Sequence, residues 1–231
     1  MTNTNLKTGR RLQQIEQMIT KHYDHIWDCC CDHGLLGFSL LNAQVAETVH
    51  FVDIVPDLMT DIEGKLQNHW QGSQQAWQVH CLDAAELPLK QLAQTDKHLI
   101  IIAGIGGELL IEIMRALLPL CTSDQIEFVL CPVHHNYKVR QFLIAHQLGL
   151  INESLVAENK RFYELLHVSR QSLKALSSVG SVMWDFNNPM HRKYLDKTIQ
   201  HYQRSTQNSS VDAHAILNQY LSLKKNTRAA I

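Results

Sequence analysis

A polar heptapeptide near the amino terminus has residue types suited to binding a nucleotide-like cofactor. It reads Asp28-Cys-Cys-Cys-Asp-His-Gly34 and stands between an apolar run, residues 25–30, and a helix-like stretch, LLGFSLLNA. At such a strand-to-helix junction, backbone N–H groups at the helix N-terminus can hold a phosphate or a cofactor. The usual junction is rich in glycine, but here Cys30 and Asp32 take the first two glycine positions and only Gly34 remains. We therefore predict cofactor contacts from Asp28, Cys30, Asp32 and Gly34.

Two further carboxylates and a glycine loop follow later apolar runs. Asp53 comes 19 residues after Gly34, where a carboxylate typically accepts hydrogen bonds from ribose hydroxyls. Asp83 ends a third run, and for both residues the alternative role is a helix cap. Gly104-Ile-Gly-Gly107 follows a fourth run, and its glycines permit positive φ angles and close backbone approach to a ligand. The neighbours of these residues complete the predicted cofactor site: Ile54, Ala84, Ile105 and Gly106.

The six cysteines are expected to be reduced packing residues. None forms a C-x-x-C pair, and neighbouring residues on a strand point to opposite faces, which prevents joint chelation. A zinc site of Cys29, Cys31 and His33 is the alternative, but its spacing matches no standard zinc pattern. We predict no metal, and the absence of disulfide patterning favours a cytoplasmic protein.

The elements that must position these residues alternate between strand and helix. Apolar runs at 25–30, 48–53, 76–81, 99–103 and 126–131 are separated by helical patterns around 57–69, 107–118 and 136–147. This alternation predicts a parallel sheet covered on both faces. Two more strands, 150–157 and 162–170, are joined by only four residues and predict an antiparallel hairpin. The fold class is therefore α/β: a doubly wound, Rossmann-like sheet of seven strands in its class I methyltransferase variant.

Helices are expected at both ends of the chain. Leu6, Leu12, Ile15, Met18 and Ile19 follow helical spacing. Near the other end, Asn188-Pro189 predicts a helix start, and a polar break at 207–210 separates two helical runs. We predict an antiparallel helical hairpin there, and a division into a cofactor-binding domain, 1–170, and a linker with a helical domain, 171–231.

Taken together, these motifs resemble the bacterial tRNA (adenine22-N1)-methyltransferase family, TrmK, over nearly the whole chain. The resemblance is carried by Asp28, Asp32, His33, Asp53, Asp83, Ile102-Ala-Gly-Ile-Gly-Gly107, Pro132, Tyr163-Glu-Leu-Leu166, the basic start Arg10-Arg11 and the helical tail. This sequence departs from the family pattern at two places. Members usually have glycine at the position of Cys30, and they usually read Gln-Pro-Asn at Cys131-Pro132-Val133. The first difference implies weaker cofactor affinity, and the second leaves the target nucleotide open.

The resemblance implies an S-adenosyl-L-methionine-dependent enzyme that methylates N1 of an adenine in tRNA. It makes Asp32 the candidate to stabilise positive charge on the base, with His33 either orienting Asp32 or capping the next helix. Candidate contacts to the RNA come from the basic start, the region after the fifth strand, the last strand and the tail: Arg10, Arg11, Pro132, Lys138, Arg140, Tyr163, Arg192, Lys193, Lys197 and Arg204.

The charge distribution agrees with a polyanionic partner. Residues 1–168 carry 12 Lys/Arg and 19 Asp/Glu, a net of −7, whereas residues 169–231 carry 9 and 3, a net of +6. A basic tail often contacts RNA, although a solvated helical face is the alternative. A small-molecule methyltransferase and a non-catalytic domain that binds RNA or protein remain open, while a nicotinamide dehydrogenase is disfavoured. No apolar run reaches the length of a membrane span, and we expect a monomer or a weak dimer.

Overall fold

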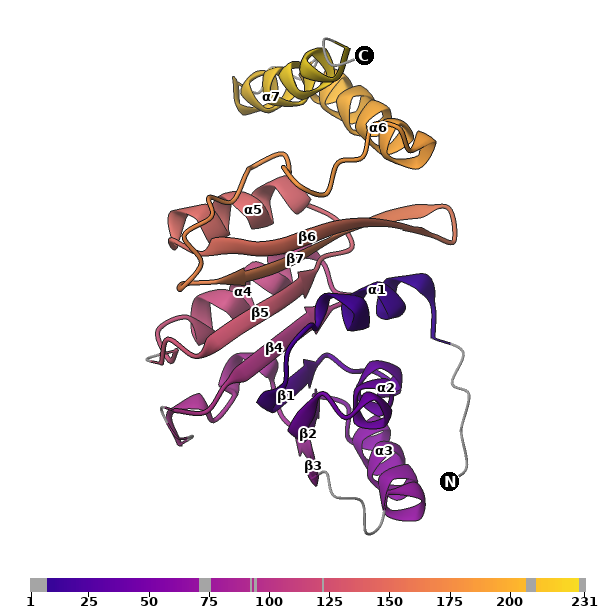
Figure 1. The fold of residues 1–231 in the computed structure, drawn as a ribbon, viewed down its shortest axis with the longest axis vertical. Helices are drawn as coiled ribbons and strands as arrows, with labels where there is room; N and C mark the ends of the chain where they lie inside the picture. Colours follow the sequence, from indigo (N-terminus) through magenta and orange to yellow (C-terminus); the bar gives the residue numbers. More distant parts are fainter. Residues whose placement is uncertain are drawn as a thin grey trace.

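A seven-stranded sheet forms the centre of the molecule (Figure 1). The computed structural model describes residues 8–70, 76–91, 93, 95–121, 123–206 and 211–228. The strands are β1 (Tyr23–Cys29), β2 (Ala46–Asp53), β3 (Ala76–Cys81), β4 (His98–Ala103), β5 (Ile126–Cys131), β6 (Gly149–Glu158) and β7 (Arg161–Ser169). Their order is β3-β2-β1-β4-β5-β7-β6; β1 to β5 are parallel, and β7 is antiparallel to β5 and β6. This confirms the predicted fold class.

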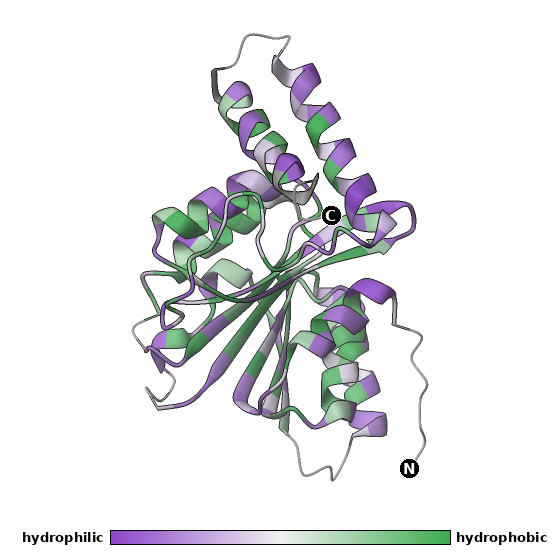
Figure 2. Ribbon diagram, turned by 45° about the horizontal axis from the view of Figure 1, so that its top comes forward, coloured by the Kyte–Doolittle hydropathy of each residue, from purple (hydrophilic) through white to green (hydrophobic). Residues whose placement is uncertain are grey.

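Helices cover both faces of the sheet. The first face packs on α1 (Arg10–Met18), α2 (Leu35–Ala43) and α3 (Pro56–His69), and the second on α4 (Gly107–Leu117), α5 (Asn136–Ala145) and the 3-10 turns η1 (Ala84–Glu86) and η2 (Leu89–Gln91). Along β4, Leu99 and Ile101 belong to the first core, whereas Ile100 and Ile102 belong to the second. A strand buried on both faces has to be apolar throughout, and Figure 2 shows hydrophobic residues concentrated along the central strands.

The predicted terminal helices are also present, although part of each prediction falls outside the described residues. In α1, Ile15 and Met18 are buried as expected, while Leu6 lies outside the described part of the chain. α6 (Pro189–Thr206) begins where predicted, with Asn188 Oδ1 accepting a hydrogen bond from the Met190 N–H at 2.9 Å. The polar break at 207–210 is not described, and α7 (Val211–Arg228) follows it.

The two tail helices pack against each other and form the predicted hairpin. Leu195 and Ile199 of α6 share a core with Tyr220 of α7, and the rings of Tyr202 and Tyr220 stack with centroids 5.7 Å apart. Asp196 and Lys224 add an ion pair across the hairpin, Oδ1 to Nζ 2.6 Å. Among the described helices, none is both long and apolar enough to cross a lipid bilayer.

A buried charge network attaches the tail to the sheet and corrects one prediction. Arg140 of α5 is 0% exposed; its Nη1 lies 2.7 Å from Glu153 Oε2 and its Nε donates to Glu164 Oε2 at 2.7 Å. Tyr194 of α6 donates its hydroxyl to the other oxygen of Glu164 at 2.5 Å. The prediction that Arg140 contacts RNA is therefore wrong, because its guanidinium is held by two carboxylates inside the protein.

Four histidines cluster beside Trp27 on the second face of the sheet. His25, His50 and His80 form a chain of ring contacts, Nδ1 of His25 to Nε2 of His50 at 3.0 Å and Nδ1 of His50 to Nε2 of His80 at 2.9 Å. The ring of His50 stacks on Trp27 at 3.7 Å, and Trp27 Nε1 donates to His98 Nδ1 at 3.5 Å. Burial lowers the pKa of His50 to about 2 and that of His98 to about 4, and neighbouring imidazoles add to the effect.

We expect this cluster to make the protein acid-sensitive. An unfolded histidine titrates near 6.5, so below that pH the unfolded state binds protons that folded His50 and His98 do not. Their contribution to stability is fully present above about pH 6.5 and falls with decreasing pH, with a slope approaching about 1.4 kcal/mol per unit for each group. Urea unfolding measured from about pH 7.5 to 5 should show this loss. His50→Gln should flatten the dependence, whereas His69→Gln, at an exposed site on α3, should leave it unchanged.

Candidate active site

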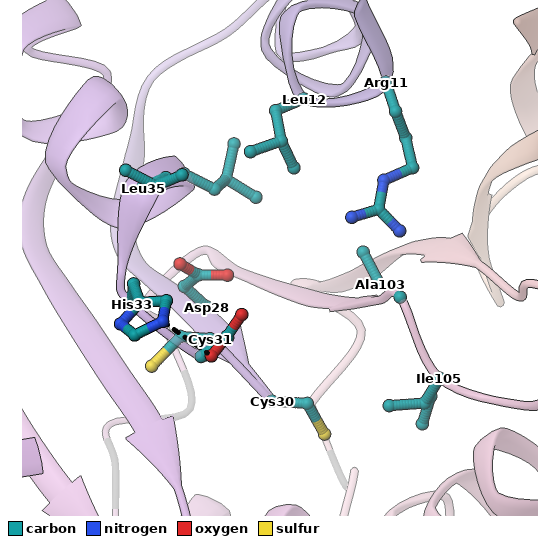
Figure 3. A pocket seen from close by; sticks show the side chains of 12 residues that line it. Arg11, Leu12, Asp28, Cys30, Cys31, His33, Leu35, Ala103 and Ile105 are labelled. Atoms are coloured by element: carbon teal, nitrogen blue, oxygen red, sulfur yellow. Dashed lines mark ion pairs between the residues drawn. The ribbon is translucent and has the colours of Figure 1, made fainter. Parts of the chain in front are cut away.

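A pocket of about 190 Å³ opens at the carboxyl ends of β1 and β4 (Figure 3). It is lined by Arg11 and Leu12 of α1, by the β1–α2 junction, by Ala103 at the end of β4 and by Gly104 and Ile105 after it. The order of the sheet reverses between β1 and β4, because β2 and β3 extend to one side and β5 to the other. In open α/β sheets, ligands bind at such a switch point.

The β1–α2 junction keeps a backbone that glycine normally adopts. Cys30, Asp32 and Gly34 have φ angles of 57°, 52° and 70°. Residues with a side chain pay about 1–2 kcal/mol for this left-handed conformation, so the loop geometry persists at a cost in stability. A side chain at Gly34 would be strained by the φ of +70°, and its Cβ would lie 3.0 Å from Ile62 Cδ1.

Asp28 has a structural role in addition to its place in the pocket wall. Its carboxylate is 4% exposed and Oδ2 accepts a hydrogen bond from the Gly37 N–H at 2.9 Å. Asp28 therefore caps the first turn of α2 from β1, where the local N-cap residue, Gly34, has no side chain to do so. Burial raises the pKa of Asp28 to about 7, the Gly37 hydrogen bond opposes this and the charge of Asp53 adds to it.

The carboxylates after β2 and β3 differ in what they already bind. Asp53 accepts hydrogen bonds from the N–H groups of Asp32 (3.1 Å) and Val55 (3.2 Å), and the N-cap residue of α3 is Val55. The capping alternative for Asp53 is thus wrong, and its carboxylate instead joins two loops at the cofactor side. Asp83 does cap η1, through an acceptor bond from Ala85 N–H at 2.9 Å.

Asp32 and His33 lie together at the rim. Both side chains are exposed, with His33 Nε2 3.7 Å from Asp32 Oδ1. The N-cap residue of α2, Gly34, makes no side-chain capping bond, and the Gly37 N–H in the first turn bonds to Asp28 rather than to His33. The role of His33 in orienting Asp32 remains a prediction.

Arg11 is placed differently from the RNA contact predicted for it. Figure 3 shows its guanidinium reaching from α1 into the pocket. Its Cζ lies 5.3 Å from the centroid of the Tyr163 ring, and its buried Nε has no hydrogen-bond partner among the described residues. A Cβ at Gly104, whose φ is +90°, would lie 3.1 Å from Arg11 Nη1. This guanidinium is suited to a carboxylate on a ligand, whereas Arg10 is exposed and lines a separate hollow against β6.

The remaining cofactor candidates differ in their relation to the pocket. Gly104 and Ile105 line it, whereas Gly106, Ile54 and Ala84 are not part of its wall. Gly106 instead lies against the His134 ring, which a Cβ there would meet at 2.8 Å. Ile54 is 66% exposed beside Asp53, whereas Ala84 is buried. Sequence reasoning missed Leu12 and Leu35 as pocket residues; the signal for Leu35 was a large apolar side chain directly after Gly34.

Five of the six cysteines are buried or half-buried, and burial raises the pKa of each of these five thiols, whereas Cys81 is exposed. Cys29 belongs to the second core and Cys31 to the first, whereas strand alternation would put two residues this far apart on the same face. The difference arises because β1 ends at Cys29 and Cys30 has a positive φ of 57°. Cys30 lines the pocket, and burial, helped by Asp53 and Asp28, raises the pKa of its thiol to about 11. Within the described residues, only exposed Glu108, His134 and His135 lie close enough to share a metal ion, so the zinc alternative is wrong.

The other candidate RNA contacts have distinct surroundings. Pro132 is buried, Tyr163 is 8% exposed under Arg11, and the Lys138 ammonium lies 3.2 Å from Glu108 Oε1. The four basic residues predicted on the tail are exposed on α6: Arg192, Lys193, Lys197 and Arg204. Arg192 Nη1 donates to the carbonyls of Phe186 and Asn187, so it also braces the segment before α6.

Comparisons with known proteins show the same architecture elsewhere. The chain is similar to the M. capricolum TrmK bound to S-adenosyl-homocysteine: 16% identity, TM-score 0.75, covering 95% of this chain and 97% of that one. It is similar to the B. subtilis M1A22 tRNA methyltransferase TrmK: 20% identity, TM-score 0.74, covering 95% and 97%. A Mycoplasma pneumoniae protein provisionally named a tRNA methyltransferase is 25% identical over 162 residues, 70% of this chain and 71% of that protein.

A match to a family model shows which protein family the chain belongs to. The model described as a methyltransferase domain matches residues 8–166, which run from α1 into β7 and contain every segment of the pocket. With that match over more than half of its length, and with a pocket at the switch point of a class I methyltransferase sheet, the chain belongs to the methyltransferase domain family.

Proposed function

We propose that this chain is an S-adenosyl-L-methionine-dependent tRNA methyltransferase that acts on N1 of an adenine. The observation that carries the proposal is the extent of the match to the TrmK structures, 95% of this chain, which takes in the tail helices as well as the sheet. The tail helices contribute no side chain to the cofactor pocket. Binding of a large substrate would explain why they are present. The division at residue 170, the cytoplasmic location and a monomeric or weakly dimeric state remain predictions.

The pocket residues fit S-adenosyl-L-methionine by the chemistry of their donors. Arg11, whose buried Nε lacks a partner, suits the carboxylate of the methionine part, and Asp28 suits a cationic group. Asp53 lies outside the pocket wall but bonds to the N–H of Asp32, which lines it, and its carboxylate suits the ribose hydroxyls. Gly104 leaves the backbone accessible because it has no side chain. When bound there, the cofactor supplies a methyl group on a positively charged sulfur.

The residues of this chain then have to orient a base and stabilise charge. Adenine N1 lies on the Watson–Crick edge, so the base has to be unpaired or flipped to react. The exposure of the Asp32 carboxylate supports a role in stabilising positive charge on the base. No protein nucleophile is needed, which agrees with the raised pKa of the Cys30 thiol. Alignment of the base with the methyl group supplies much of the rate.

The experiment that tests the proposal combines calorimetry with nucleoside analysis. The purified chain should bind S-adenosyl-L-methionine and convert adenosine to 1-methyladenosine in an unmodified tRNA pool, detected by mass spectrometry. Binding of the cofactor without any methylated nucleoside would favour a small-molecule methyltransferase. Absence of cofactor binding would favour a non-catalytic domain that binds RNA or protein. The structural argument for that alternative is the Cys30 side chain in the cofactor loop.

Asp53→Ala should weaken binding of S-adenosyl-L-methionine by about 1.5–3 kcal/mol, the range for hydrogen bonds to a charged group. Two effects act together, because the variant loses the predicted ribose contact and the hydrogen bond that holds the Asp32 backbone. Calorimetry measures the affinity, and Asp57→Ala, an equal loss of charge in the first turn of α3, is the matched control. Equal affinity in folded Asp53→Ala and wild type would remove Asp53 from the site.

A further inference from the structure

Two adjoining hollows lie between the β6–β7 turn and the tail helices. One, of about 410 Å³, extends towards α5 and α7, and the other, of about 560 Å³, extends along the start of α6. They share Lys160, Arg161, Phe162 and Lys197 in their walls, so we treat them as one surface, the α6 groove. Neither hollow is part of the cofactor pocket.

The α6 groove concentrates positive charge in a protein whose net charge is −1. Lys160 and Arg161 come from the β6–β7 turn, while Lys193 and Lys197 come one helical turn apart on α6. Within the described part of the chain, no Asp or Glu is found in the walls of either hollow. The nearby Asp196 pairs with Lys224 instead. The groove therefore complements an anionic ligand.

Aromatic rings stand among these cations. Tyr137, Phe162 and Tyr202 are half-buried in the groove walls, so each ring is partly accessible to a ligand. The Lys197 ammonium lies 5.1 Å from the centroid of Phe162. Such a contact is worth only about 0.5–1 kcal/mol at an exposed site, so the ammonium can turn to a phosphate and leave the ring for a base. Alternating cations and aromatic rings are what single-stranded nucleic acid needs.

The loop after β5 connects the wall of the α6 groove to the wall of the cofactor pocket. Val133 and His135 of this loop line the groove. The Val133 N–H donates to the Ile105 carbonyl at 2.9 Å, and Ile105 lines the cofactor pocket. A strand lying in the groove can thus contact the loop that borders the site where a target base would react.

We propose that the α6 groove holds unpaired nucleotides next to the target adenine, an inference that rests on the proposed tRNA methyltransferase function. Phosphates lie on Lys160, Arg161, Lys193 and Lys197, and at least one base stacks on Phe162. This deepens the predicted role of Lys193 and Lys197, adds the turn residues Lys160 and Arg161, and assigns an aromatic contact that positive charge alone does not require.

Phe162→Leu, which keeps an apolar side chain but removes the ring, is the first test. Its dissociation constant for an unmodified tRNA transcript should rise roughly tenfold, within the range for loss of one base–aromatic stack. Its affinity for S-adenosyl-L-methionine should be unchanged. Phe142→Leu is the matched control, because Arg115 lies 5.6 Å over the Phe142 ring in a similar cation–π pair outside the groove. A fully paired RNA duplex should bind wild type and Phe162→Leu equally, since its bases stack on each other.

Lys160→Ala with Lys197→Ala tests the phosphate contacts. The dependence of tRNA binding on salt should flatten by about 0.7 per lost contact to a single strand, whereas Lys90→Ala on η2 should not change it. If both sets of variants bind tRNA as wild type does, the inference is overturned, and an acidic peptide becomes the better occupant. Methylation by the wild type is measured separately. If tRNA binding depends on the groove residues but no 1-methyladenosine forms, the proposed enzyme function is wrong and the groove assignment is still supported.

Discussion

Arg140→Met should lower the free energy of unfolding by about 3–5 kcal/mol, the cost of removing one partner from a buried ion pair. The reason is that Glu153 and Glu164 would both remain buried without their counter-charge. Burial by itself raises the pKa of Glu153, and the Arg140 charge together with the Ser181 hydrogen bonds brings it below its ordinary value. Urea denaturation followed by circular dichroism measures the loss.

A second variant separates lost charge pairing from lost packing. Combining Arg140→Met with Glu153→Gln and Glu164→Gln should recover a large part of the stability, because no uncompensated charge remains in the core. The salt dependence of tRNA binding should stay at its wild-type value in both variants at a temperature where they are folded. A flatter salt dependence would restore Arg140 as an RNA contact and contradict its burial.

The same network should couple the tail to the sheet. Glu153 Oε1 accepts hydrogen bonds from the N–H groups of Ser181 and Met183, in the segment that leads to α6. Arg140 also donates to the carbonyl of Ser177 at 2.9 Å. Hydrogen exchange in Arg140→Met should therefore increase first at residues 177–183 and at the start of α6, ahead of β1 and β4.

Asp32→Asn should lower kcat roughly 100-fold while leaving the affinity for S-adenosyl-L-methionine nearly unchanged, the low end for loss of one preorganised electrostatic group. Asparagine keeps the shape of the side chain, and it tolerates the left-handed backbone, here φ 52°, better than most residues. The Asp32 N–H bond to Asp53 involves the backbone, so it persists in the variant.

Single-turnover rates at saturating tRNA and cofactor measure the chemical step directly. Asp32→Gly, which also suits the backbone but removes the side chain, should be at least as slow as Asp32→Asn. If the asparagine variant loses cofactor affinity yet turns over normally at saturation, Asp32 is a binding residue and its catalytic assignment is wrong. His33→Gln should have a smaller effect, since His33 acts through Asp32 at 3.7 Å.

The sequence alone determined the elements and the end of the sheet where chemistry occurs. Strand and helix periodicity predicted the five parallel strands and the closing hairpin, because each element has to bury an apolar face and its pattern is local. Local turn chemistry placed the start of α6 at Asn188-Pro189. The motif positions at strand ends located the pocket, since the carboxyl ends of parallel strands meet at one edge of the sheet.

Only the tertiary structure decided which polar side chains are free for a ligand. Arg140 follows β5 on a helix with a polar start and looked exposed, but two glutamates from β6 and β7 hold it in the core. Arg11 looked like a surface cation, but the packing of α1 across the sheet directs it into the pocket. A hydrogen-bond or ion-pair partner is set by contacts distant in sequence, and nothing in the local pattern of either residue encodes that partner.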